Sequence, residues 1–169
     1  MKSVSLTSAA DSYVRAEAPE FWKGLVAGLA AGLVATAAKS IAEKIYPPRT
    51  HGEPEPPEEL GERFAGHTLD ADTRHLAGES IHWGFGAAAG AFYGVLAEFY
   101  PAVTAKEGAA FGLTLMSLTH EGVLPAMQLD APPEDQTGRE QTSEAATHLL
   151  YGVVAERVRK IVREMLDRA

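Results

Sequence analysis

Five ionisable side chains in this sequence have the types and the order expected of metal ligands. The chain has no cysteine, so a metal site would have to use imidazole and carboxylate groups, which serve as ligands of zinc and iron. Glu79-Ser80-Ile81-His82 has the Glu-x-x-His spacing of di-iron helical bundles, although a full di-iron set needs two such motifs and only one is present. The candidate ligands for a zinc or iron ion are His82, His120, Glu121, Glu144 and His148.

Two other roles fit the same residues. Ionisable groups within membrane helices are costly unless they are paired, so they often mark a proton pathway or a binding site. His120 beside Glu121, inside an apolar run, is the sharpest case for such a relay. The interpretation that the sequence favours most is a structural polar cluster that links helices or meets headgroups and water. No catalytic residue is predicted, because the serines lack the context of a nucleophile elbow.

Four apolar segments must position these side chains, and small or polar residues recur in them at every fourth position. Residues four apart share one face of a helix, and glycine on that face lets a neighbouring backbone approach closely. The pattern predicts an all-α fold: an up-down, antiparallel bundle of four transmembrane helices that pack through glycine ladders. The rungs are Gly24, Gly28 and Gly32; His82, Gly86, Gly90 and Gly94; Gly108 and Gly112; and Glu144, His148 and Gly152.

The predicted helices cover about residues 21–46, 80–100, 107–128 and 144–166, within a single domain of residues 21–166. A polar N-terminal arm, residues 1–20, precedes this domain. Pro47-Pro48 ends the first helix, since proline lacks the amide donor and clashes with the preceding turn.

The connections between the helices are polar. A long loop rich in proline and glutamate, with one short helix around residues 57–65, joins the first two helices. Ser143 is expected to cap the fourth helix. Beyond Ala155 that helix continues as an amphipathic C-terminal extension.

Antiparallel connection of the four helices has a consequence for the candidate ligands. His82 lies at the start of the second helix, His120 towards the end of the third, and His148 near the start of the fourth. All three therefore fall at the same end of the bundle, whether or not it lies in a membrane. Glu144 joins them there, with Lys39 of the first helix at a similar level.

Three features favour a lipid bilayer as the partner of this bundle. Each glycine inside a soluble helix costs about 1 kcal/mol relative to alanine, so repeated ladders need a packing reason. Aromatic residues gather at the ends of the segments, as interfacial anchors do. Basic residues concentrate on the side that holds both termini, which the positive-inside rule places in the cytoplasm. A soluble four-helix bundle is the alternative.

The overall composition excludes one class of function and leaves oligomeric state open. The formal net charge of -8 leaves no basic stripe for phosphates, so nucleic acid is not an expected partner. The mean hydropathy of -0.10 averages apolar segments with acidic loops. The first glycine ladder is compatible with a homo-oligomer or a larger membrane complex.

The order of several short motifs resembles the YagU-like small bacterial inner-membrane proteins, a family with a domain of unknown function. The resemblance covers most of residues 22–165. It implies a multi-spanning protein of the bacterial inner membrane, without an established activity. The motifs are Pro47-Pro48-Arg49, His82, Ala97-Glu98-Phe99-Tyr100-Pro101, His120 and Ser143-Glu144-x-x-x-His148.

These observations predict a small multi-spanning inner-membrane protein, with both termini in the cytoplasm and a His/Glu cluster at the opposite end. Its expected role is that of a membrane factor or accessory subunit rather than an enzyme. The alternative from another class is a metal-binding bundle or metalloenzyme that uses the five candidate ligands.

Overall fold

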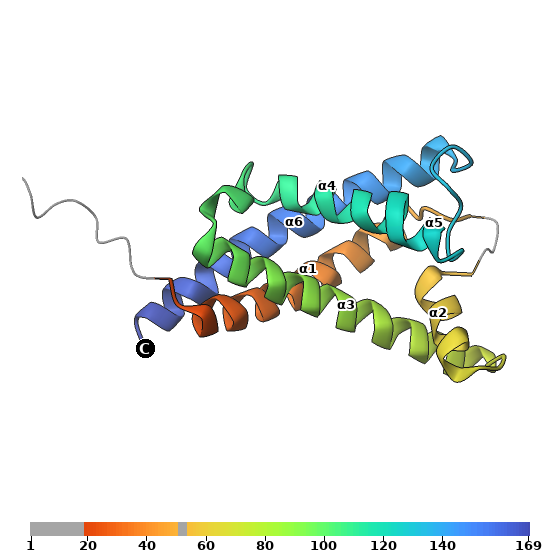
Figure 1. Cartoon of the computed structure of the whole chain (residues 1–169), viewed down its shortest axis with the longest axis horizontal. Coiled ribbons are helices and arrows are strands. Elements are labelled where there is room, and N and C mark those ends of the chain that lie inside the picture. The colour runs from red at the N-terminus through yellow and green to blue at the C-terminus, as the bar shows by residue number, and fades with distance from the viewer. Residues whose placement is uncertain (1–18, 51–53) are drawn as a thin grey trace, which may run out of the picture.

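The computed structural model describes residues 19–50 and 54–169, and every regular element in these ranges is helical (Figure 1). The predicted all-α class is therefore confirmed for this part of the chain. The predicted N-terminal arm lies outside the described residues up to position 18. The elements are α1 (Phe21–Ile45), α2 (Pro56–Ala65), α3 (Ala71–Phe99), the 3-10 turn η1 (Pro101–Thr104), α4 (Ala109–Leu118), the π-helical turn η2 (Thr119–Val123), α5 (Leu124–Ala126) and α6 (Gly138–Asp167).

Two of the long helices begin earlier than the apolar pattern indicates, because polar residues cap them. The side chain of Asp70 accepts a hydrogen bond from the Thr73 amide, 3.0 Å away, and starts α3 at Ala71. Thr137 and Glu140 form a reciprocal capping box that starts α6. Ser143, expected as the cap, lies inside α6 instead, where its hydroxyl donates to the carbonyl oxygen of Tyr46.

The third predicted helix is not a continuous α-helix, since it widens into η2 between α4 and α5. Pro125 has no amide hydrogen, and in a regular α-helix its ring would clash with the carbonyl oxygen of Glu121, four residues earlier. The amide of Leu124 donates instead to the carbonyl of Thr119, five residues back. This wider turn carries His120, and π-helical turns of this kind are frequent at functional sites.

Close backbone packing joins α3 to α1, α1 to α6 and α6 to α4. In the described ranges, the backbones of α4 and α3 do not pack closely enough to complete a ring of four helices. Figure 1 shows α1 and α6 running between α3 and the α4–α5 segment. Within the described ranges, the backbones of α3 and α4 stay apart, and the two helices meet through side chains such as Tyr93 and Phe111. The short helix α2 packs against α3, at the end of the bundle where α5 also lies (Figure 1).

Small and polar side chains fill the interior of the bundle. Its apolar centre consists of alanines and two tyrosines, with Tyr93 stacked on Phe111 at a ring distance of 4.3 Å. The hydroxyl of Tyr93 donates to the fully buried carboxylate of Glu156. The buried polar and charged residues are Thr36, Lys39, Ser143, Glu144, Thr147, His148, Glu156 and Arg159.

Candidate functional site

Close packing of α4 against α6 places η2 beside the first turns of α6. A Cβ atom on Gly112 would lie 3.0 Å from the carbonyl carbon of His148 and 3.1 Å from the amide nitrogen of Gly152. Contacts this short require the neighbouring atoms to shift, and here these atoms belong to the backbone of α6. Glycine at this position therefore lets the two backbones approach, and the continuation of α4 into η2 brings His120 to α6.

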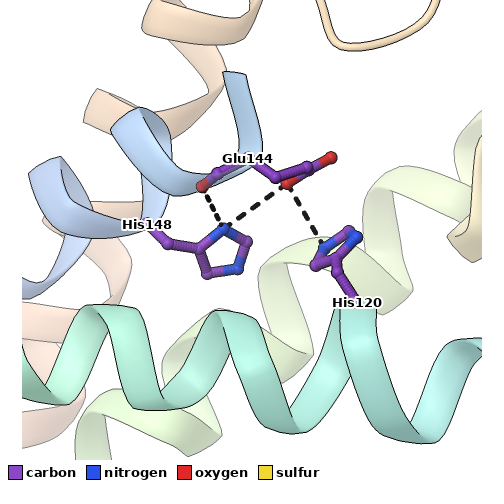
Figure 2. A group of neighbouring side chains, drawn as sticks. All are labelled: His120, Glu144 and His148. Atoms are coloured by element: carbon purple, nitrogen blue, oxygen red, sulfur yellow. Dashed lines mark hydrogen bonds and ion pairs between the residues drawn. The ribbon is translucent and has the colours of Figure 1, made fainter. Parts of the chain in front are cut away.

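The resulting cluster consists of His120 from η2 and of Glu144 and His148 from successive turns of α6 (Figure 2). His120 Nε2 and His148 Nδ1 each lie 3.4 Å from the same carboxylate oxygen, Oε2 of Glu144. His148 Nδ1 also donates to the backbone carbonyl oxygen of Glu144, 2.9 Å away. One nitrogen from each ring and a carboxylate oxygen lie within 4.8 Å of one another. This set has the composition of a metal site with three protein ligands.

Asp130, in the loop between α5 and α6, holds His120 from the other side. Its Oδ2 lies 3.3 Å from His120 Nδ1, and its Oδ1 accepts a 2.7 Å hydrogen bond from Arg49. Burial raises the pKa of Asp130, but the hydrogen bonds from His120 and Arg49 outweigh burial and hold this pKa below its ordinary value. Asp130 is therefore a carboxylate, and a carboxylate behind a histidine fixes the ring and its tautomer.

Lys39 of α1 supplies a positive charge next to the cluster. Its ammonium group donates to Glu43, and it also lies 3.5 Å from Glu144 Oε2. Among the described residues, Glu144 Oε2 is buried and accepts no hydrogen bond, although three nitrogens stand within 3.5 Å of it. An unsatisfied buried carboxylate oxygen is costly, so it calls for a physical explanation.

The cluster forms part of the lining of a cavity of about 290 Å³. This cavity lies where the bundle is open, between α3 and the α4–α5 segment, and Leu60 of α2 contributes to its lining. A mostly apolar cavity with a few converging polar groups is the usual form of a small-molecule site. The apolar side chains along the cavity are Leu60, Ile81, Phe85, Leu115, Val123, Leu124, Met127 and Leu129.

The structure brings together three of the five candidate ligands and keeps two apart from them. His82 lines the same cavity but forms a 3.1 Å hydrogen bond with Ser40 of α1. Glu121 is exposed on η2, away from the cavity lining. The ligand set that the geometry supports is therefore His120, Glu144 and His148.

Sequence reasoning assigns no site role to Asp130 or Arg49. Asp130 is one of several acids in a proline-rich loop, and Arg49 enters only as part of the Pro47-Pro48-Arg49 motif. No periodic pattern extends into either loop, so spacing alone does not place these two residues at the site. Their pairing depends on how the two loops fold back over the same end of the bundle.

An all-helical bundle with a His/Glu cluster in the wall of an apolar cavity is the class of protein that this fold and site define. The chain belongs to the family described as Protein of unknown function (DUF1440), whose model matches residues 33–157, well over half of the sequence. The matched range includes all three residues of the cluster. The comparisons with curated proteins and with solved structures gave no match.

Proposed function

We propose that this chain is a multi-spanning membrane protein in which α1, α3, the α4–α5 segment and α6 cross the bilayer. The observation that carries the proposal is an inverted distribution of side chains. The interior is built from glycine, alanine and paired charges, whereas many large apolar side chains point outward on all four segments. The exposed set includes Val26, Leu29, Leu33, Ile41, Phe92, Leu113, Leu118, Leu149, Ile161 and Met165.

This distribution suits lipid better than water as the solvent. In water, exposed apolar side chains in such numbers are a liability, and lysine, glutamate and arginine are almost never buried unless they are paired. In a bilayer, small residues mediate close helix packing, and interior ionisable groups pair with one another, as Glu156 does with Arg159. The same face of α1 that points away from the bundle carries Val26, Leu29 and Leu33.

The lengths of the helices agree with this assignment. α1, α3 and α6 have 25, 29 and 30 residues. At a rise of 1.5 Å per residue they measure about 37 to 45 Å, which exceeds a hydrocarbon core of about 30 Å. Among the described residues, α1 is the one helix long and apolar enough to cross a membrane by length and composition, a test that core helices of soluble proteins also pass. The proposal therefore rests on the side-chain distribution.

The proposed location is the bacterial inner membrane, with both termini in the cytoplasm and the His/Glu cluster towards the opposite side. The excess of basic residues near the termini and the resemblance to YagU-like proteins support this orientation. The proposed role is that of a membrane factor or accessory subunit, alone, as a homo-oligomer or within a larger complex.

Membrane fractionation tests the proposal directly. We expect the full chain to sediment with membranes, to resist extraction at alkaline pH, and to dissolve on addition of detergent. Flotation with lipid on a density gradient is the control for aggregation, because aggregated protein stays at the bottom. Recovery of the chain in the supernatant without detergent, or failure to float, would contradict the membrane assignment and favour a soluble bundle.

A further inference from the structure

The unpartnered oxygen of Glu144, Oε2, lies 3.4 Å from Nε2 of His120, while Nδ1 of that ring lies 3.3 Å from Asp130 Oδ2. In the neutral tautomer that donates from Nδ1 to Asp130, Nε2 keeps a lone pair. A cation placed between this nitrogen and Glu144 Oε2 would then be bound by both atoms. Lys39 forms an ion pair with Glu144 Oε2 at 3.5 Å, but it makes no hydrogen bond to this oxygen and is hydrogen-bonded to Glu43.

The separation of these two atoms equals that of neighbouring ligands in a tetrahedral metal site. In a tetrahedral site with metal–ligand distances of about 2.0 to 2.1 Å, neighbouring ligand atoms stand about 3.4 Å apart. The distance from His120 Nε2 to Glu144 Oε2 is 3.4 Å. Zinc is the common tetrahedral ion with imidazole and carboxylate ligands.

In each histidine of the cluster, Nδ1 has a hydrogen-bond partner that orients the ring, as metal-binding histidines usually have on their second nitrogen. Asp130 lies behind His120, and the Glu144 backbone carbonyl accepts from Nδ1 of His148, which leaves Nε2 of that ring with a free lone pair. These contacts come from a loop and from the α6 backbone, so they orient the rings whether or not a ligand is bound.

The charges around the cluster favour a divalent cation. Among the described residues, four carboxylates whose side chains are at most 24% exposed share ion pairs with two lysine or arginine side chains, Lys39 and Arg49. Apart from the histidines, four carboxylates against these two cations leave two negative charges. The four carboxylates are Glu43, Asp130, Glu140 and Glu144.

We propose that His120, Glu144 and His148 bind one Zn²⁺ ion, with a fourth coordination position open to the apolar cavity. The inference goes beyond membrane location and needs only the packing of η2 against α6. Three protein ligands and an open position are the arrangement of zinc sites that bind water or a substrate, whereas structural zinc sites have four protein ligands. The ligand that completes the site would be a small molecule with an apolar portion.

Zinc content of the purified full chain is the primary test. The protein is prepared without a histidine tag, stripped with a chelator, reloaded with Zn²⁺ and passed through gel filtration before elemental analysis. We expect about one zinc per chain, and a loss of at least about tenfold in His120→Ala and in His148→Ala. His82→Ala is the matched control, since His82 lines the same cavity outside the ligand set, and it should retain zinc.

Two further variants keep the test informative if a ligand variant fails to fold. Asp130→Asn keeps the shape of the side chain and should weaken zinc binding by about 10- to 100-fold, as loss of a carboxylate behind a metal-bound histidine does. Lys39→Met removes a positive charge near Glu144 and should tighten zinc binding by about tenfold. A merely structural cluster would give neither change. Affinity is measured by competition with a chromophoric chelator.

Three results would overturn the zinc site. They are less than about a tenth of a zinc per chain in the reloaded wild type, equal loss of zinc in His82→Ala and His120→Ala, and zinc affinity that does not respond to Lys39→Met or Asp130→Asn. Zinc content and affinity test the metal site, whereas fractionation tests the membrane assignment. Each proposal can therefore fail without affecting the other.

Discussion

Gly90→Val should prevent α1 and α3 from packing, and the variant should lose the cooperative thermal unfolding of the wild type. A Cβ atom at position 90 would lie 2.6 Å from the carbonyl oxygen of Gly28 and 2.6 Å from the amide nitrogen of Gly32. These are backbone atoms of α1, so no side-chain rotation relieves the clash, and the two helices must separate. We expect a loss of at least about 4 kcal/mol, comparable with the whole stability of many domains.

Gly84→Ala is the matched control on the same helix. A Cβ atom there would meet nothing within 4 Å, and the position is exposed. Because alanine favours the helix more than glycine does, this variant should be neutral or more stable by about 0.5 to 1 kcal/mol. Circular dichroism against temperature, in the same detergent or buffer, compares both with the wild type. A Gly90→Val variant that melts within a few degrees of the wild type would refute the close contact of α1 with α3.

The helical class of this chain was predictable because a period of four residues is a local property of the sequence. The same period, with antiparallel connection, predicts that His82, His120 and His148 lie at one end of the bundle. The period does not resolve which side chains meet across the helices. His82 and His148 line one cavity, yet Ser40 holds His82 while Glu144 holds His148.

The remaining features of the site depend on contacts between segments far apart in the chain. The hydrogen bond from Arg49 to Asp130 joins residues 81 positions apart, and the one from His120 to Asp130 crosses a loop. The rotation of His120 towards α6 depends on the π-helical turn that Pro125 imposes. Helix boundaries were missed for a simpler reason: Asp70 and Thr137 cap the helices several residues before the apolar pattern begins.

Glu156→Ala should be the most destabilising single change outside the glycine contacts. Glu156 is fully buried on α6, about two turns beyond His148. It accepts hydrogen bonds from the Tyr93 hydroxyl at 2.7 Å and from two guanidinium nitrogens of Arg159 at 2.8 and 2.9 Å. Removal of the carboxylate leaves Arg159, whose side chain is 11% exposed, without its buried partner. A charge left in that position costs about 3 to 5 kcal/mol.

Three further variants separate loss of a charge partner from loss of packing. Tyr93→Phe removes one hydrogen bond and should cost about 1 to 2 kcal/mol. Glu164→Ala breaks the exposed pair with Arg168 on the same helix and should change stability by less than about 0.5 kcal/mol. The double variant Glu156→Leu with Arg159→Leu removes both charges, so it should recover most of the stability lost in Glu156→Ala. If the double variant is less stable than Glu156→Ala, the cost lies in packing, and the buried pair does not act as this structure indicates.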